Sequence, residues 1–196
     1  MVKQVVLGAV VLLAGLGCTA DPGGTPVPAV AYAEVPGTTT TDIWACSGDS
    51  HERAQSFTAP KSGQINRISL VVATQDHPPD PLVVRIVPLT RYGWPDRTIL
   101  GQGTYSGLGG ASLAEFIDIP MSAPATVTAG QGYAIELSTG SPTCPPAGKW
   151  LVGLKEAAFG SGQDPFPGGK LWTRTRPYGD WAGGTTADLL FKVWMS

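Results

Sequence analysis

Short runs in which apolar and polar residues alternate recur along the chain from about residue 54 to residue 194. The clearest run covers residues 132–138, where Tyr133, Ile135 and Leu137 alternate with small or polar residues. A period of two indicates a β-strand with one buried face, because successive side chains of a strand point to opposite sides. Similar runs occur at residues 54–59, 68–73, 82–89, 99–105, 115–119, 125–127, 149–155, 170–175 and 187–194.

These runs predict an all-β domain. Clusters of Gly, Pro, Asp and Ser separate them, as turns separate strands, and no amphipathic helical period follows the first 17 residues. The chain has 26 Gly and 18 Pro but only 14% charged residues, which also favours many short strands. Antiparallel strands in this number, each with one polar face, favour two sheets packed together. We therefore expect an antiparallel two-sheet β-sandwich that is jelly-roll-like.

The first 17 residues have the layout of a secretory signal peptide, with Lys3 before an apolar run. That run has about a dozen residues, fewer than the ~20 that a helix needs to span a membrane. Its end at Cys18 resembles a bacterial lipobox, although Gly15 stands where that motif prefers Leu. The resemblance implies cleavage before Cys18 and attachment of lipid to Cys18. The alternative is an ordinary secretory signal followed by an incidental cysteine.

A lipid on Cys18 would anchor an exported protein to the bacterial cell envelope. Thr19 after the cysteine, rather than Asp, resembles the pattern of lipoproteins sent to the outer membrane of hosts that have one. Residues 18–45 are rich in Pro, Gly and Thr, and such a composition predicts a flexible tether. Ile43 and Trp44 are apolar exceptions that could already belong to the fold. Residues 46–196 remain as one domain, long enough to bury a core.

Charge and cysteine content limit the partners. The 13 basic and 15 acidic residues give a net charge of −2, so we expect no nucleic-acid partner, which would favour a basic patch. The expected partners are the membrane, through the N-terminal lipid, and a glycan or an envelope protein. With Cys18 lipidated, Cys46 and Cys144 remain as an even pair in an oxidising compartment. We expect a disulfide between them, and two free thiols are the alternative.

Five segments of the sequence also resemble a known family. They are AQSFTAPKSGQINRISLVV, PLVVRIVPL, GWPDRTILGQGTYS, APATVTAGQGYAIELST and ADLLFKVW. Their order and spacing are similar to those of the choice-of-anchor type R domain, a bacterial surface module. The resemblance covers about residues 54–194 and implies a sandwich like those of galactose-binding domains and carbohydrate-binding modules. It implies no catalytic motif, and the insert around Cys144 departs from the family's pattern.

Ser50 stands in a Gly-Asp-Ser sequence, which is how several serine hydrolases present their nucleophile. A serine nucleophile needs a base to take its proton and donors for the oxyanion. The neighbouring His51 would point away from Ser50 in an extended chain, and the other histidine, His77, lies in a Pro-rich loop. We therefore expect no enzymatic activity, and a serine hydrolase centred on Ser50 stays as the least favoured alternative.

Four acidic residues are weak candidates for a structural calcium ion, and we expect no other cofactor. They are Asp42, Asp49, Glu52 and Asp188. Calcium takes six to eight oxygen ligands, and this sequence has no Asp-rich loop that would supply them. The metal therefore stays an open alternative.

The aromatic residues give the best functional hypothesis, because six tryptophans are many for this length. The segment 166–188 brings several aromatic and charged residues close together in sequence. They are Trp172, Arg174, Arg176, Tyr178, Asp180 and Trp181. An aromatic face can stack on a sugar ring whose hydroxyls bond to charged groups, so we expect a non-catalytic binding or adhesion module, for which glycans are candidate ligands. Two alternatives stay open: these aromatics are buried for structural reasons, or the protein is a structural subunit or spacer of an envelope assembly.

Overall fold

The computed structural model describes residues 27–32, 39–46, 49–76, 78, 80–107, 115–139, 148–156, 164–175, 179–184 and 186–196. Within these ranges the regular structure consists of thirteen strands and no helix, and hence no helix that could cross a membrane. The strands are β1 (Val30–Tyr32), β2 (Thr39–Cys46), β3 (Asp49–Thr58), β4 (Gly63–Gln75), β5 (Leu82–Pro88), β6 (Gly101–Tyr105), β7 (Phe116–Val127), β8 (Gly132–Thr139), β9 (Lys149–Glu156), β10 (Leu171–Arg174), β11 (Ala182–Gly184), β12 (Ala187–Leu189) and β13 (Phe191–Met195).

Eight of these strands close into a β-barrel. Their order is β4–β7–β6–β5–β8–β3–β2–β9, and β9 pairs again with β4, always antiparallel. Val152 of β9 shows the closure directly, because it lies opposite Thr41 of β2 on one side and Val72 of β4 on the other. The expected two-sheet jelly-roll sandwich is therefore wrong. The alternating pattern indicates that each strand has one buried face. Strands of a sandwich and strands of a barrel both have this property, so the pattern does not distinguish the two folds.

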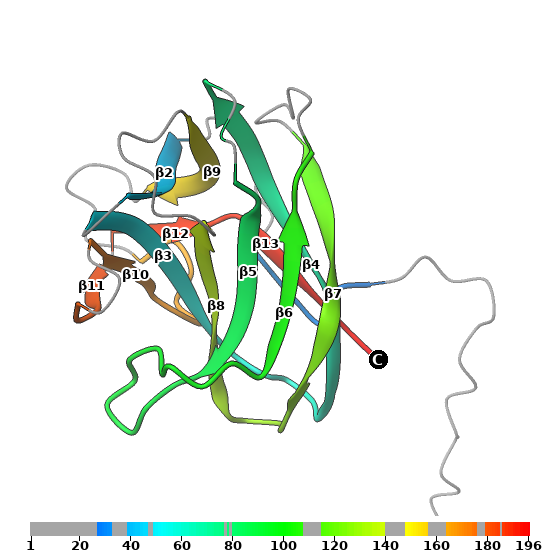
Figure 1. Cartoon of the computed structure of the whole chain (residues 1–196). Helices are drawn as coiled ribbons and strands as arrows, with labels where there is room; N and C mark the ends of the chain where they lie inside the picture. The colour runs from blue at the N-terminus through cyan, green and yellow to red at the C-terminus, as the bar shows by residue number, and fades with distance from the viewer. Residues whose placement is uncertain are drawn as a thin grey trace, which may run out of the picture.

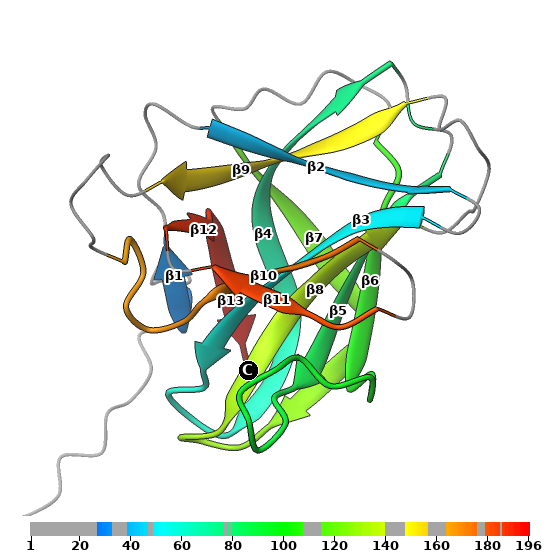
Figure 2. The same cartoon turned by 90° about the vertical axis from the view of Figure 1, so that its left-hand side faces the viewer.

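The remaining strands pair with parts of β4 and β3 and so extend the barrel (Figure 1). The first part of β4 pairs with β13 and only its last residues pair with β9; β1 then lies beside β13. In the same way β3 pairs first with β2 and then with β10, which carries β11 on its other edge. Figure 2 shows β10 and β11 in front of β8 and β5. The pair β10–β11 thus forms an outer layer over one side of the barrel.

Most strands lie at predicted runs, but several positions differ. Residues 115–119 and 125–127 belong to one long strand, β7, with an irregularity opposite residues 65–67 of β4. Residues 187–194 form two strands, β12 and β13, which pair with different neighbours. Strands β3 and β4 each begin five residues before the predicted runs, and β11 was not predicted. Finally, β1 and most of β2 lie within residues 18–45, where a tether was expected.

The main core fills the barrel. Trp150 is the largest fully buried side chain among the described residues, with 1% of its surface exposed, and its Nε1 donates to the carbonyl oxygen of Asp80 at 2.9 Å. Ile135 of β8 and Ile68 of β4 are completely buried in the same cluster. Small residues let the strands approach: a Cβ on Gly103 of β6 would lie 2.5 Å from the carbonyl oxygen of Pro120 in β7. Gly103 therefore permits the close β6–β7 contact in the barrel wall.

Candidate functional site

The outer face of β3, β8 and β5 carries a second apolar cluster under the β10–β11 layer. Ala54, Val87 and Ala134, one from each strand, are covered by Trp172 and Trp181. The alternation in β8 predicted that Ala134 and its neighbours on this face would point to solvent. Ala134 is buried instead, because it packs against the two indoles, and Glu136 and Ser138 on the same face are buried as well.

Four charged residues form a chain of ion pairs on the same face. Arg174 of β10 donates to Glu52 of β3 and lies 3.8 Å from Glu136 of β8. Arg85 of β5 donates to Glu136 at 3.0 Å. Burial raises the pKa of Glu52, and the positive charge of Arg174, which lowers that pKa, offsets the effect only in part. Buried charges are retained when they are paired, so this chain fixes β10 on the sheet.

Arg174 also supports the indole above it. Its guanidinium carbon lies 4.3 Å from the centre of the Trp181 ring, which is the geometry of a cation–π contact. Trp181 has only 9% of its surface exposed. Among the described residues no group accepts a hydrogen bond from the Trp181 Nε1. Within the described part of the chain, the indole is therefore held through its ring faces.

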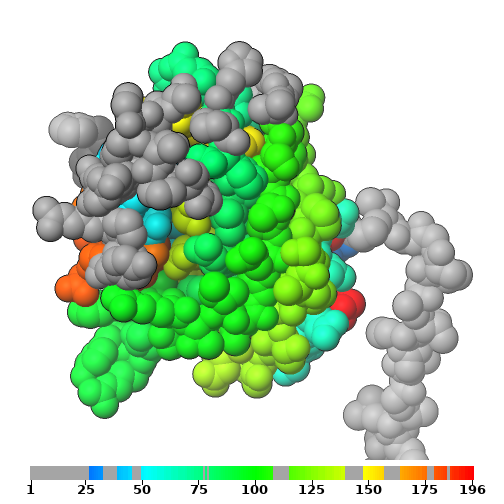
Figure 3. Space-filling view, in the orientation of Figure 1, coloured from blue at the N-terminus to red at the C-terminus, as the bar shows by residue number. Residues whose placement is uncertain are grey.

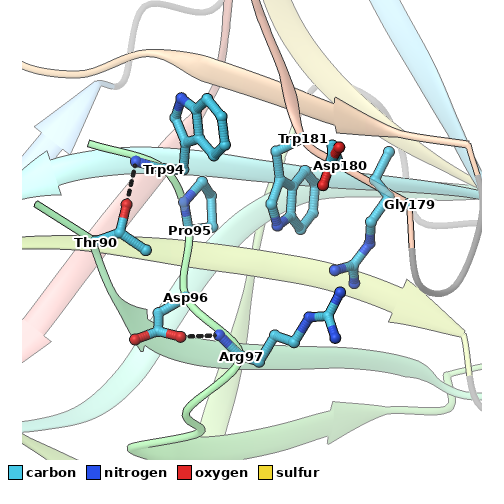
Figure 4. A pocket seen from close by; sticks show the side chains of 9 residues that line it. Thr90, Trp94, Pro95, Asp96, Arg97, Gly179, Asp180 and Trp181 are labelled. Carbon is cyan, nitrogen blue, oxygen red and sulfur yellow. Dashed lines mark hydrogen bonds between the residues drawn. The ribbon is translucent and has the colours of Figure 1, made fainter. Parts of the chain in front are cut away.

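A pocket opens beside Trp181, between the segment 179–181 and the loop that joins β5 to β6. We call it the Trp94 pocket, and its volume is about 180 Å³. It is lined by Thr90, Trp94, Pro95, Asp96, Arg97, Arg174, Gly179, Asp180 and Trp181. Figure 4 shows Trp94 and Pro95 on one side of the pocket, Trp181 and Asp180 on the other, and the Arg97 side chain extending below them. Figure 3 shows the β5–β6 loop as a projecting lobe at the lower left.

Backbone hydrogen bonds shape the loop side of the pocket. Thr90 N donates to the Trp94 oxygen at 2.7 Å, and Gly93 N donates to the Thr90 oxygen at 2.8 Å. Gly93 has a φ of 81°, a conformation that a residue without Cβ adopts readily. Asp96 N donates to the Pro88 oxygen at the end of β5. This loop therefore has a defined shape, and it leaves Trp94 46% exposed.

The structure brings together only some of the predicted site residues. Arg174, Asp180 and Trp181 line the pocket, and Asp180 is exposed. Trp172 is 7% exposed and belongs to the apolar cluster beneath the pocket. This agrees with the alternative that some of these aromatic residues are buried for structural reasons. The predicted residues Arg176 and Tyr178 lie outside the described residues.

The sequence analysis missed the other six pocket residues, of which Trp94, Asp96 and Arg97 carry aromatic or charged groups. The signal was present in the sequence Trp-Pro-Asp-Arg, an aromatic residue next to charged residues in a loop. Read alone, this sequence indicated only a turn. Its partner segment, 179–181, lies more than 80 residues later in the chain, and only the fold brings the two together.

Ser50, the alternative nucleophile, is completely buried in β3, and its backbone N–H donates to the Thr175 oxygen at 3.0 Å. A substrate carbonyl therefore has no access to its hydroxyl. His51 Nδ1 lies 3.2 Å from Asp42 Oδ1, and the centre of the His51 ring lies 4.5 Å from that of Trp44, with the two rings tilted by 31°. These contacts give His51 a partner other than Ser50.

The calcium candidates occupy separate environments. Burial alone would raise the pKa of Asp42, but hydrogen bonds from His51 and Lys149 outweigh it and lower that pKa. Glu52 is paired with Arg174, as described above, and Asp188 accepts a hydrogen bond from Gln55 at 2.7 Å. In the described part of the chain no three His, Cys, Asp or Glu side chains are grouped as a metal site would require. The side chain of Asp49 lies outside the described residues.

The cysteine predictions also lie largely outside the described residues. Cys18 and Cys144 are not among them, so lipidation and the disulfide stay predictions. Cys46 ends β2 opposite Asp49, the first residue of β3. Asp49 and Ser50 thus lie in a strand that pairs with the end of β2.

Comparison with known proteins leaves the function to be argued from the site. No family model and no curated protein sequence matches the chain, so the resemblance to choice-of-anchor type R domains stays a prediction. Among solved structures, the chain is similar to the cysteine protease and lectin-like domains of Cwp84, a surface layer associated protein of Clostridium difficile. The sequence identity is 12% and the TM-score is 0.46, and the match covers 80% of this chain and 36% of that chain.

Proposed function

We propose that this protein is a cell-envelope-anchored, non-catalytic binding module that takes a carbohydrate in the Trp94 pocket. The observation that carries the proposal is the pairing of a half-exposed indole with exposed and half-exposed carboxylates in one shaped hollow. Ligand sites commonly combine apolar walls with a few placed polar groups. A sugar matches this combination because its ring has apolar C–H faces and its edge carries hydroxyls.

Each wall of the pocket has a distinct role in this proposal. Trp94 offers an aromatic face to the C–H groups of a sugar ring. Asp96 and Asp180 accept hydrogen bonds from sugar hydroxyls, and bonds to a charged acceptor are stronger than neutral ones. Arg97 donates to ring or hydroxyl oxygens.

The location of the pocket suits an anchored module. Figure 1 shows β10, β11 and the β5–β6 loop on the left of the molecule, whereas β1 and the C-terminus lie on the right. The described chain enters at Val27, just before β1. A lipid attached to Cys18 would therefore hold the right-hand side nearer to the membrane. The Trp94 pocket would then face away from it, toward external glycans.

A glycan array probed with the complete chain tests the proposal. We expect binding to a subset of the glycans, and loss of that binding in Trp94→Ala. The matched control is Trp194→Ala, which removes another partly buried indole on a different strand, β13. Binding that is lost equally in both variants, or an array with no bound glycan, would contradict the proposal and favour the structural role.

A further inference from the structure

A second hollow lies on the outer face of β13, β4 and β7. We call it the Trp194 groove, and its volume is about 600 Å³. It is lined by Val27, Asn66, Arg67, Pro120, Trp194 and Met195. The strand register places Trp194 opposite Arg67, and Arg67 opposite Pro120. The groove thus crosses three neighbouring strands, and the proposed sugar site does not include any of its residues.

Two cations stand over aromatic rings on this sheet face. The Arg67 guanidinium lies 4.0 Å from the centre of the Trp194 ring, and Lys192 Nζ lies 4.1 Å from that of Phe116. Asp118 accepts a hydrogen bond from Arg67 at 2.8 Å, and it lies opposite Ser69, the β4 residue that also lies opposite Lys192. A guanidinium has five N–H donors, so Arg67 keeps donors for a further anionic group.

The indole of Trp194 is held with its polar edge inward. Its Nε1 donates to the Ser69 hydroxyl at 2.6 Å, and that hydroxyl also bonds to Asp118. The ring is therefore oriented by the sheet, and its apolar surface lines the groove together with Met195 and Val27. Val27 is 83% exposed. Aromatic residues, apolar side chains and cations in this combination are typical of the membrane–water interface.

The path of the chain relates this face to the predicted anchor. Ala29 N donates to the Val193 oxygen at 2.8 Å, which fixes the entering chain beside β13. Cys18 precedes Val27 by nine residues, and nine extended residues span about 30 Å at most. A lipid on Cys18 would therefore keep the Trp194 groove within about 30 Å of the bilayer. Tethering at this range makes even a weak surface contact effective, because the local concentration is high.

We propose that the Trp194 groove docks on the membrane surface. Arg67 and Lys192 bond to the phosphates of lipid headgroups, and Trp194, Met195 and Val27 enter the boundary between headgroups and acyl chains. The inference rests on the envelope anchor of the proposed function. It adds a defined orientation to that function, since docking through this face turns the Trp94 pocket outward.

Side-chain oxidation by hydroxyl radicals tests the docking. The complete lipidated chain is placed on vesicles of phosphatidylethanolamine and phosphatidylglycerol, and the unlipidated Cys18→Ser chain is measured in solution. We expect oxidation of Trp194 and Met195 to fall several-fold on the vesicles. Trp94, on the far side, should change less than twofold and serves as the internal control. Unchanged oxidation of Trp194 and Met195, or an equal fall at Trp94, would overturn the docking.

A matched charge reversal tests the role of the cation. Arg67→Glu should restore the oxidation of Trp194 on vesicles to within twofold of its rate in solution. Arg91→Glu is the control, because Arg91 lies 4.6 Å from the Tyr92 ring centre in the β5–β6 loop, and it should leave the protection intact. Equal protection in both variants would contradict the proposed phosphate contact.

Two further results distinguish a failure of the membrane docking from a failure of the lipid anchor. Protection of Trp194 that appears in solution as protein concentration rises would assign the groove to a second copy of the chain and overturn membrane docking. Mass spectrometry of the membrane-extracted protein reports the anchor itself. An unmodified Cys18 would overturn the anchor together with the docking, whereas a lipidated Cys18 with an unprotected Trp194 would overturn only the docking. Neither result changes the glycan-array outcome.

Discussion

The guanidinium of Arg174 lies between the Trp181 indole, 4.3 Å from the ring centre, and the buried carboxylate of Glu52, to which it donates a hydrogen bond. The wall of the Trp94 pocket is therefore coupled to the charges buried beneath it. Because β10 contributes Arg174 and β3 contributes Glu52, the same contact also fastens the outer layer to the barrel.

Arg174→Ala should destabilise the protein strongly. It leaves Glu52 buried without its cation, and breaking a buried pair from one side typically costs about 3–5 kcal/mol. Urea unfolding measures the loss. The control is Arg67→Ala, which removes a cation over an indole and an ion pair at a site about one-third exposed. Exposed pairs contribute about 1 kcal/mol or less, so equal losses in the two variants would contradict this interpretation.

Two tryptophans should respond differently to replacement by phenylalanine. Trp150→Phe removes the hydrogen bond to the Asp80 oxygen, whereas Trp172→Phe removes an Nε1 that has no acceptor among the described residues. Leaving a buried polar group unpaired costs about 1–3 kcal/mol. The free energy of unfolding should therefore fall further in Trp150→Phe by about that amount. A larger loss in Trp172→Phe would show that its N–H is bonded.

Asp188 should make stability depend on pH. Burial, together with the neighbouring Asp164, raises the pKa of Asp188 to about 7 from its ordinary value of 3.8. Between these values the folded protein holds a proton that the unfolded chain has released. Its contribution is therefore complete below pH 3.8 and is lost as pH rises toward 7. The loss is at most about 1.4 kcal/mol per pH unit.

Asp188→Asn removes this titration, because the amide resembles the protonated acid. Across pH 4–7 the unfolding free energy of this variant should fall less than that of the parent, as measured by denaturant unfolding at each pH. Asp118→Asn, at a half-exposed site, is the control and should follow the parent. A parent and an Asp188→Asn variant with parallel pH profiles would show that Asp188 is ionised throughout.

Gly103→Ala should weaken the barrel wall. Its Cβ would lie 2.5 Å from the backbone oxygen of Pro120, which cannot move without disturbing β7. Overpacking of this kind costs about 1–3 kcal/mol. Gly132→Ala is the control, because its Cβ would meet only the side chain of Leu89, which can rotate away. Thermal unfolding compares the two, and an equal or larger loss in Gly132→Ala would be inconsistent with the close β6–β7 contact.

The sequence predicted strands well because burial imposes a period of two. Tyr133, Ile135 and Leu137 of β8 face the barrel core, as the alternation indicated. Closure of the barrel was not predictable in this way. It depends on β2, whose sequence TTTDIWAC is mostly polar and reads as part of a tether, and on the pairing of Val152 with strands far away in sequence.

Three of the nine residues that line the pocket could be inferred from the sequence. Arg174, Asp180 and Trp181 lie within eight residues of one another, so their clustering was visible. Trp94 and the residues after it come from a distant loop, and no local pattern links them to Trp181. Glu136 was predicted to face solvent because its side chain is charged. It is buried instead, because Arg85 and Arg174 lie close enough to pair with its carboxylate.

Titration calorimetry with the glycan that binds most strongly on the array tests the central claim most directly. The claim is that the Trp94 pocket holds the ligand, so the complete chain should bind with one site, and Trp94→Ala and Asp180→Ala should each weaken binding at least tenfold. Trp194→Ala should bind as the parent does. Unchanged affinity in both pocket variants, with each still folded, would contradict the claim and place the ligand elsewhere on the protein.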